Sequence, residues 1–453
     1  MRAAKRTTVA LAAIALAIAA TTCGKPAGKP GARPNLLLIT VDTLRQDHVG
    51  AYGGAVKTPT LDRLAAEGFL FVDAFAVAPT TLPSHTSLFT GSYPHRHGVR
   101  FNGTQRASAD QRMLAEILSE SGYSTAAFVG SAVLDGFYGL DQGFDVYDDE
   151  FGTDPSLEQE QRRAESVARP AISWLARAEA PYFVWVHLFD PHGPYDPPSP
   201  YDHDYYEGDP RSPEHRSMEN IPLVFYQNLQ GITDIRYPLA QYKGEIGYTD
   251  QGIGSILDAI DDRDDAAGTL VVMTADHGES LGEDQYYFDH GETLHDACMR
   301  VPLLVRAPWR GAGKVVRGPV SLVDLLPTVL SLLGLVAPGD TEGQDLTPYL
   351  DSGTVPDRMV FFETYLPTLS RRSPLFGVQT AEWKTIGNAG HAALFHHPSD
   401  PRETVNLASQ NTNKLNELRA VLVRYANTRP TSGEMIQPSD EQLEKLRALG
   451  YVR

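Results

Sequence analysis

Cysteine is nearly absent from this sequence, which has only Cys23 and Cys298 among 453 residues. If Cys23 carries a lipid, Cys298 has no partner and no disulfide can form. Cys298 lies between Ala297 and Met299 just before an apolar run, a setting typical of a small hydrophobic side chain packed in a core. The sequence therefore does not predict a disulfide scaffold.

Basic residues are also scarce relative to acidic ones. The chain has 39 Lys and Arg against 57 Asp and Glu, a formal net charge of −18 at pH 7. Nucleic-acid phosphates require a basic surface, so this balance argues against a nucleic-acid partner. It also argues against a broadly polyanionic substrate, unless the site itself is locally positive. The plainer interpretation of the charge is solubility.

Long apolar runs are missing beyond the N-terminus. The run at residues 9–20 follows three basic residues and is too short to span a bilayer as a stable helix. Cys23 follows A-T-T, which resembles a bacterial lipoprotein cleavage site. We expect a signal peptide at residues 1–23, a flexible tether at residues 24–33, and an exported protein of the periplasm or cell envelope. Its membrane contact would be a lipid on Cys23, with plain secretion as the alternative.

Apolar β-branched runs alternate with segments of helical period along most of the chain. The sequence predicts strands at residues 36–41, 69–77, 125–129, 182–189, 270–274 and 301–306. It predicts helices at residues 58–68, 111–121, 158–178, 246–260 and 320–333. This alternation is typical of parallel βαβ units, and 42% apolar residues suffice for a large core. We expect a large, mostly parallel sheet flanked by helices over residues 34–335.

The pattern changes after Gly334. Residues 375–386 and 392–397 predict an antiparallel pair, and residues 413–425 predict a helix that covers it. We therefore expect a smaller C-terminal α+β domain over residues 336–425.

Two further stretches differ from this pattern. Residues 194–240 are rich in Pro, Tyr and Asp and show little periodicity, which is typical of a lid or substrate loop. Residues 426–453 form a tail whose last part, residues 439–453, has an acidic start and an apolar stripe before Gly450, which predicts a short docking helix.

The most distinctive stretch is residues 79–91, P-T-T-L-P-S-H-T-S-L-F-T-G, with four Thr and two Ser. Hydroxyls this dense next to Pro and Gly predict a turn that runs into a helix start, where free N–H groups favour an anion. Thr81 is the candidate nucleophile, and Pro83 falls in the first turn, where its missing N–H costs nothing. Taken alone, the segment could be a plain helix cap.

Acidic residues follow two of the predicted strands. Asp42 ends the first strand, and Asp276 and His277 follow the strand at residues 270–274. Enzymes with open α/β sheets place their ligands at the carboxyl ends of such strands. We expect Asp42, Asp276 and His277 to meet Thr81 at one edge of one sheet.

With these motifs, the sequence resembles the sulfatase branch of the alkaline phosphatase superfamily. The signature of that family is C/S-x-P-x-R-x-x-x-x-T-G, and residues 81–91 follow its spacing but depart from it at the first and fifth positions. The resemblance also covers P-N-L-L-L-I-T-V-D-T-L-R, Y-P-H-R-H-G-V-R, D-P-H-G-P-Y-D-P-P, A-D-H-G-E and R-V-P-L-L-V-R-A-P. It implies the mixed-sheet fold with a smaller C-terminal domain and the hydrolysis of sulfate or phosphate esters.

The resemblance also implies a metal site. Asp42, Asp276 and His277 match metal positions of the family, and Thr81 would complete the site through its oxygen. Many sulfatases carry a second Asp where this chain has Thr43, and Asn where it has His277. Losing a carboxylate and gaining an imidazole moves the site away from a calcium cage and toward manganese or zinc. We expect one divalent metal ion, with Mn or Zn favoured and Ca left open.

Thr81 is the main departure from the sulfatase pattern. Sulfatases convert Cys or Ser at this position to formylglycine, whereas the methyl group on the Thr β-carbon prevents formation of that aldehyde. Thr is the direct nucleophile in nucleotide pyrophosphatases and phosphoethanolamine transferases of the same superfamily. The resemblance therefore implies a covalent phospho-threonine intermediate and favours phosphate esters.

Five more residues are candidates for contacts in or around the reaction site. Asn102 matches a substrate-oxygen-binding Asn of phosphonate monoester hydrolases. His192 matches a histidine that contacts the ester, and His290 falls where many relatives carry Lys, so either could be the general acid. His85 replaces the signature Arg and is expected to brace the nucleophile loop. Arg45 could pair with substrate or simply form an ion pair with Asp47.

We therefore expect a metal-dependent hydrolase that prefers phosphate mono- or diesters or phosphonate monoesters, with Thr81 as nucleophile. The alternatives are a true sulfatase acting on sulfated glycans and a non-catalytic member of the family. The partner would be a small-molecule or glycan ester, and the oligomeric state is left open.

Overall fold

The computed structural model describes residues 33–151, 161–388, 390–428, 433–440, 442–443 and 446. The signal peptide and all but the last residue of the tether lie outside the described residues, as does half of the C-terminal tail. Among the helices that are described, none combines the length and apolar character needed to cross a membrane.

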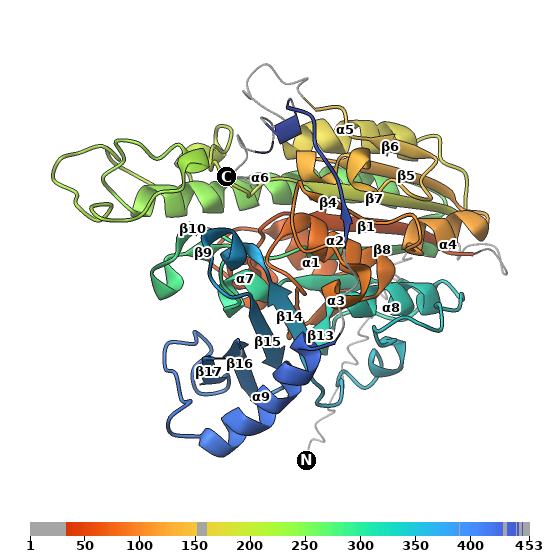
Figure 1. The fold of residues 1–453 in the computed structure, drawn as a ribbon. Helices are drawn as coiled ribbons and strands as arrows, with labels where there is room; N and C mark the ends of the chain where they lie inside the picture. The colour runs from red at the N-terminus through yellow and green to blue at the C-terminus, as the bar shows by residue number, and fades with distance from the viewer. Residues whose placement is uncertain are drawn as a thin grey trace, which may run out of the picture.

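An eight-stranded sheet forms the centre of the molecule (Figure 1). In spatial order its strands are β12 (Lys314–Val316), β2 (Phe69–Phe71), β11 (Leu303–Arg306), β8 (Thr269–Ala275), β1 (Asn35–Val41), β7 (Tyr182–Leu188), β5 (Ser124–Val129) and β6 (Val146–Asp148). β1 is parallel to both of its neighbours, whereas β11 is antiparallel to both of its own. The predicted large, mostly parallel sheet is confirmed.

The three central strands, β1, β7 and β8, are buried along their whole length. This follows from their composition, because near-continuous apolar runs are stable only when both faces of a parallel sheet are covered. Their carboxyl ends meet at one edge, where the Asp42 N–H donates to the Leu188 carbonyl at 2.9 Å. The site therefore lies at the end of the fully buried strands of the sheet.

Helices pack as two groups around this sheet (Figure 1). One group contains α1 (Pro59–Glu67), α5 (Ala164–Leu175) and α6 (Arg236–Asp261). The other contains α2 (Thr81–Thr90), α3 (Pro94–His97), α4 (Leu114–Glu120) and α8 (Leu325–Leu332). The helix predicted at residues 246–260 lies within α6, which starts earlier. Its first half buries polar side chains such as Gln241 and Glu245, so the apolar period does not reveal it.

Several short elements connect these layers. They are β3 (Ala74–Phe75) paired with β13 (Val320–Ser321), β9 (Ser280–Leu281) paired with β10 (Tyr287–Asp289), β4 (Gln105–Arg106) paired with β18 (Glu434–Met435), and α7 (Asp296–Met299). The single strand predicted at residues 69–77 is wrong, because the chain divides there into β2 and β3. The helix predicted at residues 320–333 begins as β13. The expected lid, residues 194–240, is largely irregular and projects beside the start of α6 (Figure 1).

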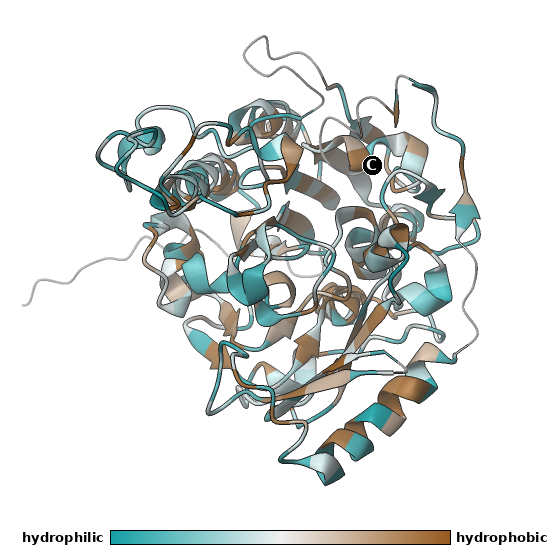
Figure 2. Ribbon diagram, turned by 60° about the vertical axis from the view of Figure 1, so that its left-hand side comes forward, coloured by the Kyte–Doolittle hydropathy of each residue, from teal (hydrophilic) through white to brown (hydrophobic). Residues whose placement is uncertain are grey.

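The smaller C-terminal domain is confirmed as a four-stranded antiparallel sheet with one covering helix. Its elements are β14 (Val360–Thr364), β15 (Leu375–Gln379), β16 (Trp383–Gly387), β17 (Ala392–His396) and α9 (Thr412–Ala426). The stretch at residues 375–386, expected as one strand, is a hairpin of β15 and β16. Figure 2 shows apolar and polar residues on different sides of α9, as a helix that covers a sheet requires.

The core of this domain includes side chains from the larger one. Val77 and Ala78, which precede α2, pack in one cluster with Val378 and Leu394 of the small sheet. The backbone N–H of Glu363 in β14 also donates to the Val77 carbonyl at 3.0 Å. The segment that leads to Thr81 is therefore packed against the C-terminal sheet.

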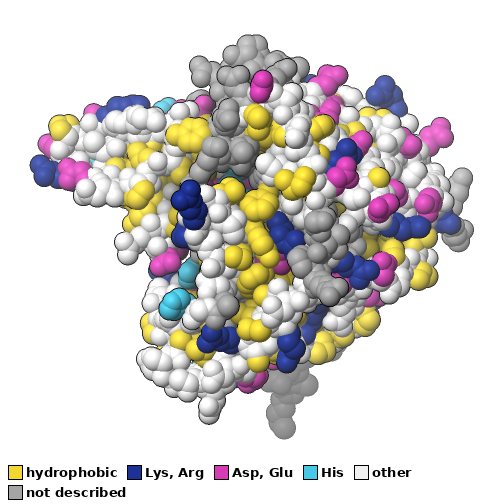
Figure 3. Space-filling view, viewed as in Figure 1, with side chains coloured by type: hydrophobic (Ala, Val, Ile, Leu, Met, Phe, Trp, Pro, Cys, Tyr) yellow, Lys and Arg dark blue, Asp and Glu magenta, His cyan; other side chains and the backbone are white. Residues whose placement is uncertain are grey.

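Charged side chains of both signs are interspersed over the face seen in Figure 3. The acidic excess of the sequence is thus not collected into one block on that face. Mixed charges of this kind are typical of a solvated surface.

Gly377 of β15 offers a test of the packing in the small sheet. A Cβ atom at this position would lie 1.9 Å from the Phe362 ring, which is fully buried. We expect Gly377→Ala to lower the free energy of unfolding by about 1–3 kcal/mol through overpacking. Gly268→Ala is the matched control, because a Cβ there meets nothing within 4 Å. Urea denaturation of both variants measures the difference, and equal stability would contradict the packing.

Candidate active site at the carboxyl edge of the sheet

Asp42 follows β1 directly and is fully buried. The next residue, Thr43, has φ of +52°, a left-handed conformation that is uncommon for a β-branched side chain. Tyr242 of α6 holds this turn, since its hydroxyl donates to the Thr43 carbonyl at 2.8 Å and accepts from the Arg45 N–H at 3.1 Å. Backbone strain held in place by its surroundings is typical of functional sites.

Thr81 is the first residue of α2, and Thr80 is the N-cap. The predicted helix start with Pro83 in its first turn is thus confirmed. The Ser84 hydroxyl donates to the Asp276 carbonyl at 2.6 Å and so ties this turn to the end of β8. Thr81 itself is fully buried. The hydrogen bond of Ser84, about one helical turn from Thr81, therefore holds the candidate nucleophile at the edge of the sheet.

The structure brings Asp42, Thr81, Asp276 and His277 together. The His277 Nε2 atom lies 3.4 Å from Thr81 Oγ1, 3.4 Å from Asp276 Oδ2 and 3.7 Å from Asp42 Oδ1. The Nδ1 atom of the same ring donates to the Gly278 carbonyl at 2.9 Å, which leaves the Nε2 lone pair facing the two carboxylates. This is the tautomer that a metal-ligating histidine needs.

The two aspartates are electrostatically incomplete without a cation. Neither carboxylate oxygen of Asp42 has a hydrogen-bond partner among the described residues, and Asp276 Oδ2 also has none. Burial, reinforced by the neighbouring Asp276 charge, raises the pKa of Asp42, and burial raises the pKa of Asp276 to about 7. A divalent cation would keep both groups ionised, and Asp42, Asp276 and His277 have donor atoms close enough to share one. The residues therefore fit a metal ion.

His290 and His192 lie on the other side of His277. The ring of His290 is centred 4.5 Å from that of His277 and 5.0 Å from that of His192. Burial opposes a charge on His290, but the carboxylates of Glu279, whose Oε1 lies 3.4 Å from its Nδ1, of Asp289 and of Asp276 together outweigh this effect and raise the pKa. His192 donates from Nδ1 to the Gly193 carbonyl at 2.7 Å, and burial lowers its pKa. One ring is thus suited to carry a proton and the other to remain neutral.

Asn102 and His85 both contact the start of α2. The Asn102 Oδ1 atom accepts the Leu82 N–H at 2.9 Å, so its amide NH₂ is turned away from the helix. The His85 Nδ1 atom donates to the Thr81 carbonyl at 2.8 Å, and its Nε2 lies 3.0 Å from Thr40 Oγ1. Burial lowers the pKa of His85 to about 4. His85 is therefore a neutral brace of the nucleophile turn.

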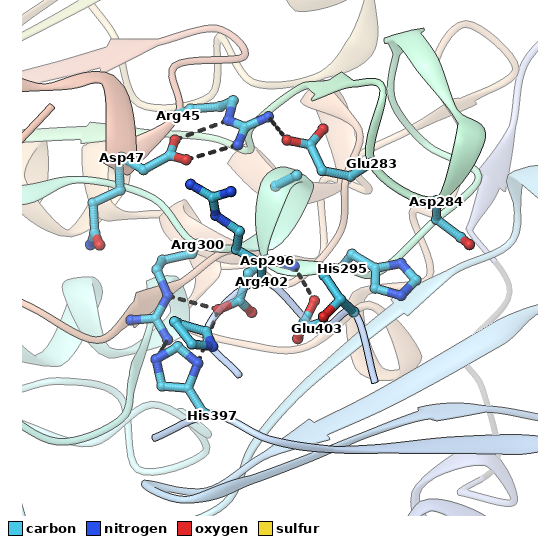
Figure 4. Close-up of a pocket in the computed structure, with 14 residues that line it drawn as sticks. Arg45, Asp47, Glu283, Asp284, His295, Asp296, Arg300, His397, Arg402 and Glu403 are labelled. Atoms are coloured by element: carbon cyan, nitrogen blue, oxygen red, sulfur yellow. Dashed lines mark hydrogen bonds and ion pairs between the residues drawn. The ribbon is translucent and has the colours of Figure 1, made fainter. Parts of the chain in front are cut away.

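Arg45 lines a cavity of about 790 Å³ that borders the site (Figure 4). Its guanidinium binds both oxygens of Asp47, at 2.9 and 2.8 Å, and Glu283 at 2.8 Å. Of the two roles expected for Arg45, these contacts correspond to the ion pair with Asp47. On the far side of the cavity, Asp296 and Arg300 form another ion pair at 2.8 Å. The cavity is thus lined by charges that are largely paired with one another.

Sequence reasoning missed two residues of this region, Glu279 and His187. Glu279 Oε1 lies 3.4 Å from His290 Nδ1, although the A-D-H-G-E motif contains this glutamate. His187 is the last residue but one of β7, and the only available signal was a histidine inside an otherwise apolar strand. Tyr226 was placed in the expected lid, where a tyrosine could line a pocket, and it stacks on His192 with ring centroids 5.9 Å apart and donates to Asp289 at 2.9 Å.

A mixed sheet whose central parallel strands end at a helix-start hydroxyl, two buried aspartates and an imidazole defines a hydrolase fold of the alkaline phosphatase type. Within that class, the model of the Sulfatase family matches residues 34–335, and the chain belongs to this family. A second model, described as the C-terminal part of N-sulphoglucosamine sulphohydrolase, matches residues 282–427. The resemblance expected from the motifs is thus confirmed.

Relatives and solved structures include both sulfatases and phosphonate hydrolases. An ulvan-active sulfatase of Formosa agariphila is 27% identical over 412 residues, which cover 83% of this chain and 77% of that protein. An N-acetylglucosamine-6-O-sulfatase of Bacteroides thetaiotaomicron is 24% identical over 488 residues, with 88% and 86% covered. The crystal structure of a phosphonate monoester hydrolase of Agrobacterium radiobacter matches with a TM-score of 0.71 at 24% identity, covering 93% and 96%. These likenesses support a sulfatase-family hydrolase of esters.

Asp190, two residues before His192, should make stability depend on pH. Burial raises its pKa to about 6 from an ordinary value of 3.8, although its Oδ2 accepts the Ala164 N–H at 2.8 Å. Between these two values the native carboxyl holds a proton that the unfolded chain has released. The contribution of Asp190 to stability is therefore present below about pH 4 and falls by up to about 1.4 kcal/mol per pH unit until about pH 6.

Asp190→Asn removes this titration and keeps an oxygen that can accept the backbone bond. We expect the free energy of unfolding of the wild-type protein, minus that of the variant, to fall as pH rises from 4 to 6. Urea denaturation at several pH values measures this difference. A difference that stays constant with pH would contradict the raised pKa.

Proposed function

We propose that this protein is a metal-dependent hydrolase of phosphate mono- or diesters or phosphonate monoesters, with Thr81 as the direct nucleophile. The observation that carries the proposal is the position of Thr81 Oγ1. It lies at the start of a helix, 3.4 Å from His277 Nε2 and beside two buried carboxylates, of whose four oxygens three have no hydrogen-bond partner among the described residues. A hydroxyl in this setting can be activated for attack on an ester.

The metal would be held by Asp42, Asp276, His277 and the Thr81 hydroxyl. Two carboxylates and an imidazole favour Mn or Zn over a calcium cage built only from oxygen ligands. When bound, such an ion lowers the pKa of a coordinated hydroxyl and polarises the ester oxygens. The fit rests on the three unpartnered carboxylate oxygens of the two aspartates and on the inward-facing His277 Nε2.

Side chains of the protein would carry out the remaining steps of the reaction. The Thr81 hydroxyl releases its proton to solvent, its Oγ1 attacks phosphorus to form a new P–O bond, and the ester bond to the leaving oxygen breaks. His290, whose pKa is raised, gives that oxygen a proton, whereas His192 stays neutral with its Nδ1 proton donated to the Gly193 carbonyl. Water then cleaves the phospho-threonine and releases the free enzyme. The Asn102 amide NH₂ is available to donate to a non-bridging oxygen, because the bond from the Leu82 N–H fixes its Oδ1.

Hydrolysis of sulfate esters on glycans is the second candidate. The names of the Formosa and Bacteroides relatives support it. Thr81 opposes it, because the methyl group on its Cβ prevents conversion to the formylglycine that sulfatases use. The likeness to a phosphonate monoester hydrolase supports the phosphate candidate. We rank phosphate and phosphonate esters first for this chemical reason.

We also propose that the protein is exported and attached to the cell envelope through a lipid on Cys23. The support is the pattern of the first 23 residues, in which three basic residues, a short apolar run and A-T-T-C follow one another. Its substrate would then be an extracytoplasmic ester.

Thr81→Val should abolish turnover and leave the fold unchanged. The substitution replaces the hydroxyl by a methyl group of similar size, and loss of a covalent nucleophile costs about 10³-fold or more in kcat. Thr86→Val is the matched control, since this buried hydroxyl on the same helix only donates to the Leu82 carbonyl at 2.7 Å. Steady-state kinetics with metal analysis of each protein measures the effect. Retained activity in Thr81→Val would refute the role of Thr81.

A panel of aryl esters separates the candidate functions. We expect kcat/KM to be highest for a phosphate monoester, a phosphodiester or a phosphonate monoester, and lower by at least about tenfold for the aryl sulfate. Each substrate is assayed with Mn²⁺, Zn²⁺ and Ca²⁺ added separately. A preference for the sulfate would establish the glycan sulfatase alternative, and no turnover of any ester with any metal would establish a non-catalytic member.

A further inference from the structure

His187 is a fully buried histidine that the proposed mechanism does not use. It lies on β7 and pairs in register with Thr40 of β1, so its side chain is on the same face of the sheet as Asp42. Neither of its ring nitrogens has a hydrogen-bond partner among the described residues. Each buried polar atom left unpaired costs about 1–3 kcal/mol. An imidazole retained under this penalty points to a ligand.

His187 lies close to a carboxylate of the proposed metal site. The His187 Nε2 atom lies 3.7 Å from Asp42 Oδ2, and the His277 Nε2 atom lies 3.7 Å from the other oxygen, Asp42 Oδ1. The Asp42 carboxylate thus lies between two imidazoles, and neither is close enough to form a hydrogen bond with it. Two donors bound to one ion at about 2.1 Å are at most about 4.2 Å apart. Both separations fall within that limit.

His187 also lies close to the second carboxylate. Donor atoms of His187, His85 and Asp276 all lie within 4.8 Å of one another. Asp276 is therefore common to this group and to the group formed with Asp42 and His277.

His85 belongs to this group by distance but not by chemistry. Its Nδ1 must carry the proton, because it donates to the Thr81 carbonyl at 2.8 Å. Its Nε2 accepts from the Thr40 hydroxyl at 3.0 Å, and that hydroxyl in turn accepts the Trp185 indole N–H at 2.9 Å. Both nitrogens of His85 are occupied, so His187 is the imidazole of the pair that can offer a lone pair to a metal.

We propose that His187 is a metal-ligating residue, which supplies a second imidazole to the ion held by Asp42, Asp276 and His277. This inference rests on the proposed metal-dependent function and deepens it. Two imidazoles with two carboxylates make a borderline donor set that selects zinc or manganese, and calcium binds such a set poorly. His277, which departs from the family pattern, and His187 would then together determine which metal binds.

X-ray absorption of the zinc-loaded wild-type protein tests the proposal without any variant. The full chain, purified and loaded with one equivalent of Zn²⁺, should show scattering from two imidazoles. One imidazole would overturn the assignment of His187 as a ligand. Absence of any bound zinc, manganese or calcium would instead overturn the metal-dependent function itself, so the two failures are distinguishable.

Two variants give an independent measurement of zinc affinity. We expect His187→Ala and the larger His187→Gln to lower the affinity, measured by competition with a chromophoric chelator, by more than about 100-fold. His97→Gln is the matched control, because this buried histidine bonds the Ser87 hydroxyl at 2.7 Å and has no part in the site. Circular dichroism identifies the variants that are folded.

Co²⁺ in place of zinc reports the coordination in each folded variant. Loss of His187 as a ligand should change the visible Co²⁺ spectrum, whereas His97→Gln should leave it as in the wild type. An unchanged spectrum with an affinity within about tenfold of the wild type would overturn the proposal. So would a larger loss of affinity with an unchanged spectrum, because that result would make His187 a positioning residue for Asp42.

Discussion

Two aspartates, buried side by side with three carboxylate oxygens unpaired, are the constraint on which the rest of this structure depends. Burial without a counterion would push Asp42 and Asp276 toward the neutral form. The neighbouring imidazoles do not remove the conflict, since burial lowers the pKa of His277 as well. A cation resolves it, and Thr81 lies at the same point.

The surrounding elements can be understood as supports for this point. Tyr242 of α6 holds the strained turn after Asp42, and Ser84 of α2 ties Thr81 to the end of β8. His85 fixes the same turn from below. These supports come from α2 and α6, which lie far apart in the sequence, so the site forms only when sheet and helices are assembled. This is preorganisation of the kind that catalysis by electrostatics requires.

Much of the fold could be predicted because its signals are local. The apolar runs that become β1 and β8 end at Asp42 and Asp276, and the turn chemistry before Pro83 marks the start of α2. The first half of α6 escaped because buried polar residues such as Glu245 interrupt its apolar period. The division of residues 69–77 into β2 and β3 was not predicted, because the two strands belong to different sheets. Such features are set by tertiary contacts.

The candidate site shows the same limit. Asp42, Asp276 and His277 could be predicted to meet, since strand ends converge. A sequence does not show which histidine nitrogen is free, so His187 looked like one more residue of a buried strand. For Arg45 the sequence left two roles open, and only the contacts with Asp47 and Glu283 show that its charge is already matched.

The shared core at Val77 and Ala78 has a consequence for how such chains can change over time. These residues precede Thr81 by four and three positions and pack against the small sheet. The C-terminal domain therefore supports the turn that carries the nucleophile. A recombination that replaced this domain would have to reproduce its inner surface or misplace the reactive hydroxyl. The two domains of this hydrolase are therefore expected to be inherited as one unit.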